Sequence, residues 1–120
     1  MGKVRSMLDT VRETVTRASL SASDQLAFLR SIGLPNGADE IALDLEYVLM
    51  VARTLAKEGE ISEKAVEAIS AIDQKFLEMT ANKDLWSVEA LRDSMHWEEA
   101  RILAREALKL LPPATNQDNS

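Results

Sequence analysis

His96 is the only histidine in this 120-residue chain, and it lies three residues after Asp93 and three residues before Glu99. On one continuous helix this spacing brings two carboxylates and an imidazole close enough to contact a metal ion. We expect a helix boundary near Ser94 and Met95, so the continuous helix that this arrangement needs is not formed. The chain also has no Glu-x-x-His sequence, the motif of di-metal carboxylate bundles. The sequence therefore predicts no metal site and no other cofactor.

Other catalytic chemistry finds little support in the residue types. The absence of cysteine excludes disulfides, thiolate metal sites and a cysteine nucleophile, and a Ser–His–Asp arrangement could use only His96. The four glycines are scattered at predicted helix ends rather than gathered in a phosphate-binding loop. We predict that the protein is not an enzyme. An enzyme that uses carboxylates alone stays an alternative, although no paired-acid spacing stands out among the twenty acids.

The elements that position these side chains all have the hydrophobic spacing of helices. The composition is that of an ordinary globular domain, with 46% hydrophobic residues, 28% charged residues and only seven glycines and prolines. We predict an all-α single domain, a bundle of five to six helices over residues 1–111, followed by a disordered tail over 112–120 that begins at Pro112-Pro113. The expected helices cover about 3–18, 22–32, a segment that follows Asn36 and ends before Gly59, then 62–79, 87–94 and 97–110. Asn36, with Asp39 three residues later, is the expected capping signal of the third helix.

The third predicted helix is nearly apolar all round. One face repeats Ile, Leu, Val and Ala at helical spacing, and a second face carries Leu43, Tyr47 and Met50. Such a helix belongs in the centre of a bundle, or it has one face covered by a partner. We expect Leu43, Tyr47 and Met50 to be core residues in a six-helix bundle, and an interface if they are exposed.

Three other apolar side chains bear on possible surfaces. Trp86 and Trp97 flank the short fifth segment, where they could anchor a partner or wedge the last helix onto the bundle, and we favour the wedge. Ile102 lies on the charged side of the last helix, and a single apolar residue there is a weak indication of a partner surface.

Charge indicates the kind of partner. The net charge is −6, and residues 39–99 alone hold fifteen acids and six bases, a net −9. An acidic surface attracts basic proteins and repels phosphate backbones. A helix-turn-helix formed by the second and third helices would present Asp39, Glu40 and Asp44 to nucleic acid, so we predict no nucleic-acid binding.

Membrane association also finds no support. The longest apolar run is five residues, 48–52, and the amphipathic first helix has no aromatic residue on its apolar face. We therefore expect a cytoplasmic protein that does not bind membranes.

Residues 84–91 (DLWSVEAL) and 97–108 (WEEARILAREAL) resemble the C-terminal end of small helical bacterial proteins. In its short length, acidity, lack of cysteine and lack of a catalytic set, the chain resembles by type the immunity proteins of bacterial toxin systems, including contact-dependent growth inhibition. The resemblance implies a protein that binds a cognate toxin domain and blocks its active site. These families share no common signature, so no inhibitory residue is carried over.

Together these features predict an acidic protein-binding inhibitor that neutralises a basic nuclease-type toxin domain. The alternative is a homo-oligomeric helical adaptor or structural protein closed by Leu43, Tyr47 and Met50, although we favour a monomer. The predicted partner-binding acids form two unranked patches, Asp39, Glu40, Asp44, Glu46, Glu58, Glu60 and Glu63 in the first, and Asp84, Glu89, Asp93, Glu98 and Glu99 in the second.

Overall fold

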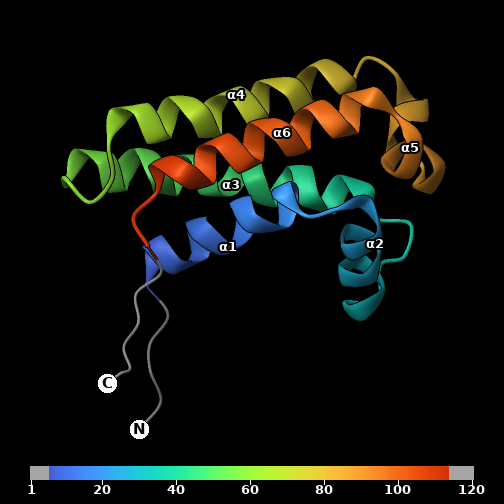
Figure 1. Cartoon of the computed structure of the whole chain (residues 1–120), viewed down its shortest axis with the longest axis horizontal. Helices are drawn as coiled ribbons and strands as arrows, with labels where there is room; N and C mark the ends of the chain where they lie inside the picture. Colours follow the sequence, from blue (N-terminus) through green and yellow to red (C-terminus); the bar gives the residue numbers. More distant parts are fainter. Residues whose placement is uncertain (1–5, 114–120) are drawn as a thin grey trace, which may run out of the picture.

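The computed structural model describes residues 6–113, and every regular element in that part of the chain is helical (Figure 1). The prediction of an all-α fold is confirmed. The elements are α1 (Met7–Ser19), α2 (Ala22–Ser31), α3 (Ala38–Lys57), α4 (Glu63–Met79), the short 3₁₀ helix η1 (Lys83–Trp86), α5 (Val88–Asp93) and α6 (Met95–Leu110).

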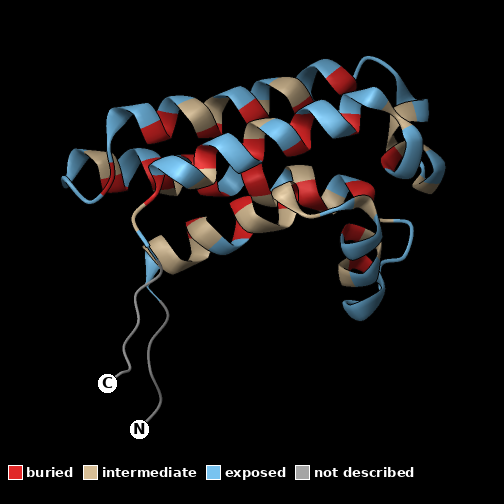
Figure 2. Ribbon diagram, viewed as in Figure 1, coloured by how far each residue is buried: buried red, intermediate tan, exposed pale blue. Residues whose placement is uncertain are grey.

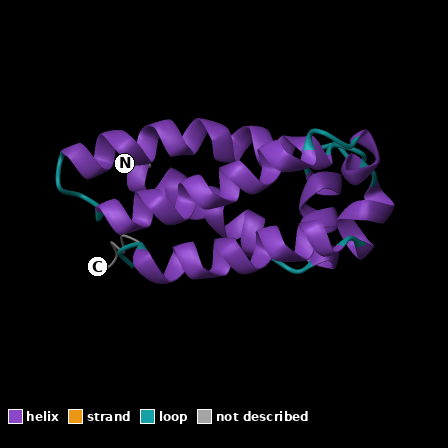
Figure 3. Ribbon diagram, turned by 90° about the horizontal axis from the view of Figure 1, so that it is seen from above, coloured by secondary structure: helices purple, strands orange, loops and turns teal. Residues whose placement is uncertain are grey.

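Four long helices form the bundle. α1 packs against α3 and α6, α4 packs against the same two helices, and neighbouring helices run antiparallel (Figure 1). A tight turn joins α3 to α4 at one end of the bundle. The connection between α1 and α3 contains α2, and the connection between α4 and α6 contains η1 and α5. Both connections lie at the opposite end of the bundle (Figure 3). We call this opposite end the crossover end.

Local sequence signals set most helix boundaries. Ser21, Ser62 and Ser87 accept hydrogen bonds from backbone N–H groups three residues later, at 3.2, 3.0 and 3.0 Å, as expected for N-caps. Gly59 ends the α3 region with φ +78°, a conformation that glycine adopts without steric cost.

Three predicted helix starts differ from the structure, and one of them is that of α6, which begins at Met95 instead of about residue 97. The first helix begins at Met7, whereas the prediction began it near residue 3, and residues 1–5 lie outside the described part of the chain. α3 begins at Ala38 after Gly37, which makes no side-chain capping bond, so the expected capping signal from Asn36 is wrong.

The core lies between the four long helices, where each contributes one apolar stripe (Figure 2). α1 and α3 supply mainly aliphatic side chains, and α4 adds Phe76. α6 contributes small residues together with Trp97, which is completely buried. The favoured interpretation of Trp97 as a wedge that seats the last helix on the bundle is therefore confirmed. Small buried side chains on α6 allow close approach of the neighbouring helices, and the Trp97 indole packs at the crossover end against Phe76 and Trp86.

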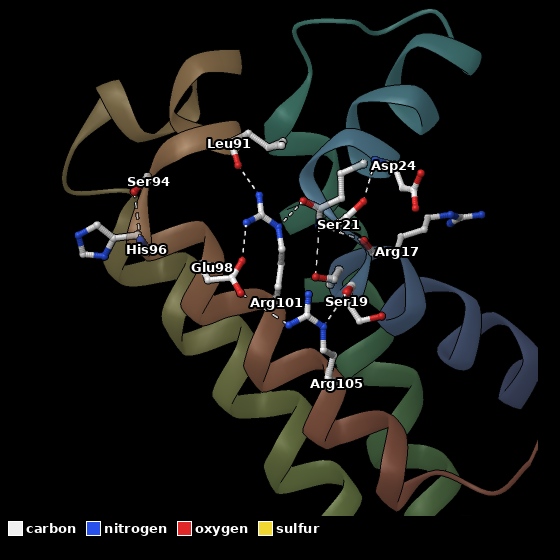
Figure 4. A network of polar contacts seen from close by, with 12 residues as sticks. Arg17, Ser19, Ser21, Asp24, Leu91, Ser94, His96, Glu98, Arg101 and Arg105 are labelled. Carbon is white, nitrogen blue, oxygen red and sulfur yellow. Dashed lines mark hydrogen bonds and ion pairs between the residues drawn. The ribbon is translucent and has the colours of Figure 1, made fainter.

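A buried polar network holds the crossover end together. Arg101 and Gln25 are only 3% and 1% exposed. The Arg101 guanidinium donates to Gln25 Oε1 at 2.9 Å, to Glu98 Oε1 at 3.0 Å and to the backbone carbonyl of Leu91 (Figure 4). Gln25 Nε2 in turn donates to two carbonyls in the last turn of α1, at 3.0 and 3.2 Å. The network therefore links α1, α2, α5 and α6, and it satisfies carbonyls that a helix end leaves without partners.

The chain stays attached to the bundle just past α6. Arg12 Nη1 on α1 donates to the carbonyl of Pro112 at 2.8 Å, and Pro112 is half-buried. The rest of the predicted tail, residues 114–120, lies outside the described part of the chain.

Candidate functional site: a groove between α3 and α4

A groove of about 400 Å³ lies between the first half of α3 and the last half of α4, and η1 closes it at the crossover end. Because α3 and α4 are antiparallel, the start of one helix lies beside the end of the other. The lining combines an apolar floor with a charged rim. It consists of Asp39, Ala42, Leu43, Glu46, Asp73, Phe76, Leu77, Thr80, Lys83 and Trp86.

An apolar row on α3 continues from this groove along the helix. Leu43, Tyr47 and Met50 are 54%, 61% and 64% exposed, so the expectation that they belong to the core is wrong. In a bundle of four long helices, α3 contacts α1 and α4 and keeps an outward face. The short helices gather at the crossover end and leave that face open (Figures 1 and 3). We call these three residues the α3 row.

The end wall of the groove is held in a defined position. Trp86 Nε1 donates to the carbonyl of Met79 at 3.2 Å, and its ring meets Trp97 edge-on at a centroid distance of 5.6 Å. Trp97 Nε1 donates to the carbonyl of Leu85 at 2.7 Å, which fastens η1 to α6. Phe76 lies 6.1 Å from Trp86 and 5.3 Å from Trp97. The two tryptophans thus fix the segment that carries Lys83 and Trp86 into the groove.

The rim of the groove is acidic. Asp39 and Glu46 come from α3 and Asp73 from α4, against one base, Lys83. Within residues 6–113 none of the three acids forms an ion pair. Burial raises the pKa of Asp73, and the neighbouring Glu46 carboxylate raises it further, while Arg53 acts in the opposite direction. The groove therefore concentrates negative charge over an apolar floor.

The first predicted acidic patch is divided by the fold. Only Asp39 and Glu46 reach the groove. Glu40 and Asp44 lie a quarter turn or more away around α3, where the Asp44 carboxylate raises the pKa of Glu40. The remaining members lie at the α3–α4 turn or just after it, at the other end of the bundle, and are Glu58, Glu60 and Glu63.

The second predicted patch is partly occupied by internal ion pairs. Asp93 pairs with the adjacent Arg92, and Glu98 contacts Arg101 and Arg105 at 3.0 and 3.7 Å. Glu99 pairs with Lys75, which lowers the pKa of Glu99. Asp84 and Glu89 lie in the first turns of η1 and α5 and are exposed.

The expected interruption near Ser94 is confirmed, since α5 ends at Asp93 and α6 begins at Met95. His96 Nδ1 lies 3.0 Å from Lys75 Nζ, and Asp93 is engaged elsewhere. Among residues 6–113, no three His, Asp or Glu side chains are grouped closely enough to hold a metal ion.

Sequence reasoning missed half of the groove. Asp73 lies in the second half of α4, whereas the predicted acids were chosen at helix starts and turns, and no α4 residue of the groove was among them. One local signal was available, because Leu77 follows Asp73 by one helical turn and lies outside the apolar stripe of this helix. That stripe, which follows from helical spacing, consists of Ala65, Ile69, Ile72, Phe76 and Met79. Leu77 is 52% exposed in the structure. That Asp73 faces Glu46 depends on how α3 and α4 pack.

No protein-family model, curated protein or solved structure matched this chain when each was searched. In the part of the chain that the structure describes, no helix has the length and apolar content needed to cross a membrane.

Proposed function

We propose that this protein binds a basic surface of another protein through the α3 row and the adjoining groove, and that it serves as an immunity-type inhibitor of a nuclease toxin domain. The observation that carries the proposal is the exposed α3 row, Leu43, Tyr47 and Met50, beside a groove with an acidic rim. Protein interfaces favour aromatic residues and methionine in their centre and polar groups at their edge. Tyr47 and Met50 would form the centre, and the rim acids its polar edge.

The charge of the site supports a basic partner. Proteins that cleave RNA or DNA carry positive charge around the cleft that receives the phosphate backbone. An acidic inhibitor is attracted to such a cleft and excludes the substrate by occupying it. The resemblance by type to immunity proteins of toxin systems agrees with this assignment.

The test is capture from the source cell with the tagged full-length chain at low and high salt, followed by purification of the captured protein and measurement of its Kd. Replacing Tyr47 and Met50 by alanine should weaken binding about 30-fold or more, the effect of losing one or two central interface side chains. Ile102→Ala on α6 is the matched control, because Ile102 is apolar and 48% exposed but lies on another helix. Equal affinities of the two variants contradict the proposal, as does capture of nucleic acid alone.

Self-association is the second candidate, because the exposed α3 row could also pair with its own copy about a twofold axis. The two candidates differ in their salt dependence. Salt weakens binding to a basic partner, because it screens the attraction between opposite charges. Salt strengthens the pairing of two acidic copies, because it screens their repulsion. Sedimentation of the purified chain over a range of concentration and salt separates them. A dimer that strengthens with salt and is lost in the Tyr47 and Met50 double variant favours self-association.

A further inference from the structure

The groove can be assigned a more specific occupant, and the assignment rests on the proposed function. We propose that the groove between α3, α4 and η1 is a pocket for the side chain of an arginine on the partner protein. The aliphatic part of the arginine lies along the apolar floor and its guanidinium meets the acidic rim.

The volume and lining fit a long side chain with an apolar stem. A volume of about 400 Å³ lies in the range of pockets that enclose small ligands. Leu43 and Leu77, from the two facing helices, offer contact to methylene groups, and both are more than half exposed. Trp86 also lines the groove, and an indole is the kind of ring on which a guanidinium stacks. An arginine needs both surfaces, because its stem is apolar and its head is planar and charged.

The charges of the groove call for a cation. Three carboxylates share it with one ammonium group, and none of the three carboxylates is neutralised by an ion pair within residues 6–113. Asp73 is half-buried and close enough to Glu46 for the two to repel each other. Two carboxylates from different helices can accept the separate N–H groups of one guanidinium. Binding a second cation would relieve this repulsion, which the unbound fold has to tolerate.

The pocket is also preformed. Trp86 is held by its hydrogen bond to the Met79 carbonyl and by its ring contacts with Phe76 and Trp97. A site whose walls are already in place loses little conformational entropy when a ligand enters. We therefore expect the pocket to bind the side chain of arginine even when it is detached from a partner.

The experiment uses two small probes that differ in charge and share their shape. Acetyl-arginine methylamide carries the guanidinium, and acetyl-citrulline methylamide carries a neutral urea of the same length. Each is titrated into the full-length ¹⁵N-labelled protein at low salt, with the indole N–H signal of Trp86 as the readout. We expect the arginine probe to bind with a Kd on the order of 1 mM. The citrulline probe should bind about 10-fold more weakly, since it lacks the charge.

Two variants connect the binding to the groove. Asp73→Asn should raise the Kd of the arginine probe about 5-fold, because it removes a carboxylate of the rim. Lys83→Gln should lower the Kd of the arginine probe about 3-fold, because Lys83 is the one base among the groove's described lining residues. Tighter binding by this variant cannot result from unfolding. Glu63→Gln is the control, because Glu63 lies at the start of α4, far from the groove, and this variant should leave the Kd of both probes unchanged.

The outcomes separate this proposal from the proposed function. Equal binding of the arginine and citrulline probes, or no effect of Asp73→Asn and Lys83→Gln, overturns the arginine pocket while the α3 row can still bind a partner. Selective binding of the arginine probe supports the pocket even if capture of a basic partner fails.

Discussion

Gln25 is the residue whose replacement should most clearly reveal what holds the crossover end together. It is 1% exposed, accepts a hydrogen bond from Arg101 and donates to the carbonyls of Arg17 and Ala18. Gln25→Leu keeps the approximate size of the side chain but leaves the Nε–H of a buried guanidinium without an acceptor. A lost hydrogen bond to a charged group contributes about 1.5–3 kcal/mol, and the two carbonyls add to this. We expect a total loss of about 3 kcal/mol in the free energy of unfolding.

The assay is urea unfolding followed by far-UV circular dichroism, with the free energy obtained by linear extrapolation. For a domain of this size, a loss of about 3 kcal/mol lowers the Tm by roughly 10–15 °C. Gln74→Leu, at an exposed position of α4, is the matched control and should change stability by about 0.5 kcal/mol or less.

A double variant tests whether Gln25 and Arg101 act as a unit. Arg101→Met alone should also destabilise, because it leaves Gln25 Oε1 and the Leu91 carbonyl without their donor. With both residues replaced by apolar ones, the loss should be smaller than the sum of the single losses by about 1–3 kcal/mol. A Gln25→Leu variant as stable as Gln74→Leu would show that the buried hydrogen bonds of Gln25 do not stabilise the crossover end. Single losses that simply add would show that Gln25 and Arg101 do not act as a unit.

Three further predictions follow from single features of the fold. A raised pKa means that folded Asp73 holds its proton more tightly than the unfolded chain does, so the wild type loses stability as the pH rises through the folded pKa. Asp73→Asn should therefore have a higher Tm than the wild type at pH 7, with the advantage disappearing below about pH 3.9, and a Tm difference independent of pH contradicts this. Gly59→Ala should cost about 1 kcal/mol through backbone strain alone, because φ is +78° and no atom lies within 4 Å of the added Cβ, so a neutral result in urea unfolding counts against it. Trp97→Phe should lower the free energy of unfolding by about 2 kcal/mol, because it removes the hydrogen bond to the Leu85 carbonyl and part of a buried ring. Unchanged hydrogen-exchange protection of the Trp86 indole N–H in this variant would show that other contacts hold η1.

The helices could be predicted from the sequence because the signals that specify them are local. The apolar spacing of α4, its N-cap at Ser62 and the left-handed turn at Gly59 all act within one or two turns of the chain. The same locality explains why the interruption between Asp93 and His96 could be predicted, and with it the placement of Asp93 on a different helix from His96 and Glu99.

Which helix faces are covered depends on how the helices pack against one another. Leu43, Tyr47 and Met50 have the same hydrophobicity whether they face a neighbouring helix or water, and their exposure follows from where α2 and α5 pack. Conversely, Arg101 is an ordinary basic residue in the sequence, but in the fold it is buried and bonded to Gln25, 76 positions earlier. The groove exists because two antiparallel helices bring Glu46 and Asp73 together. Contacts between residues distant in sequence depend on helix packing, which local periodicity does not encode.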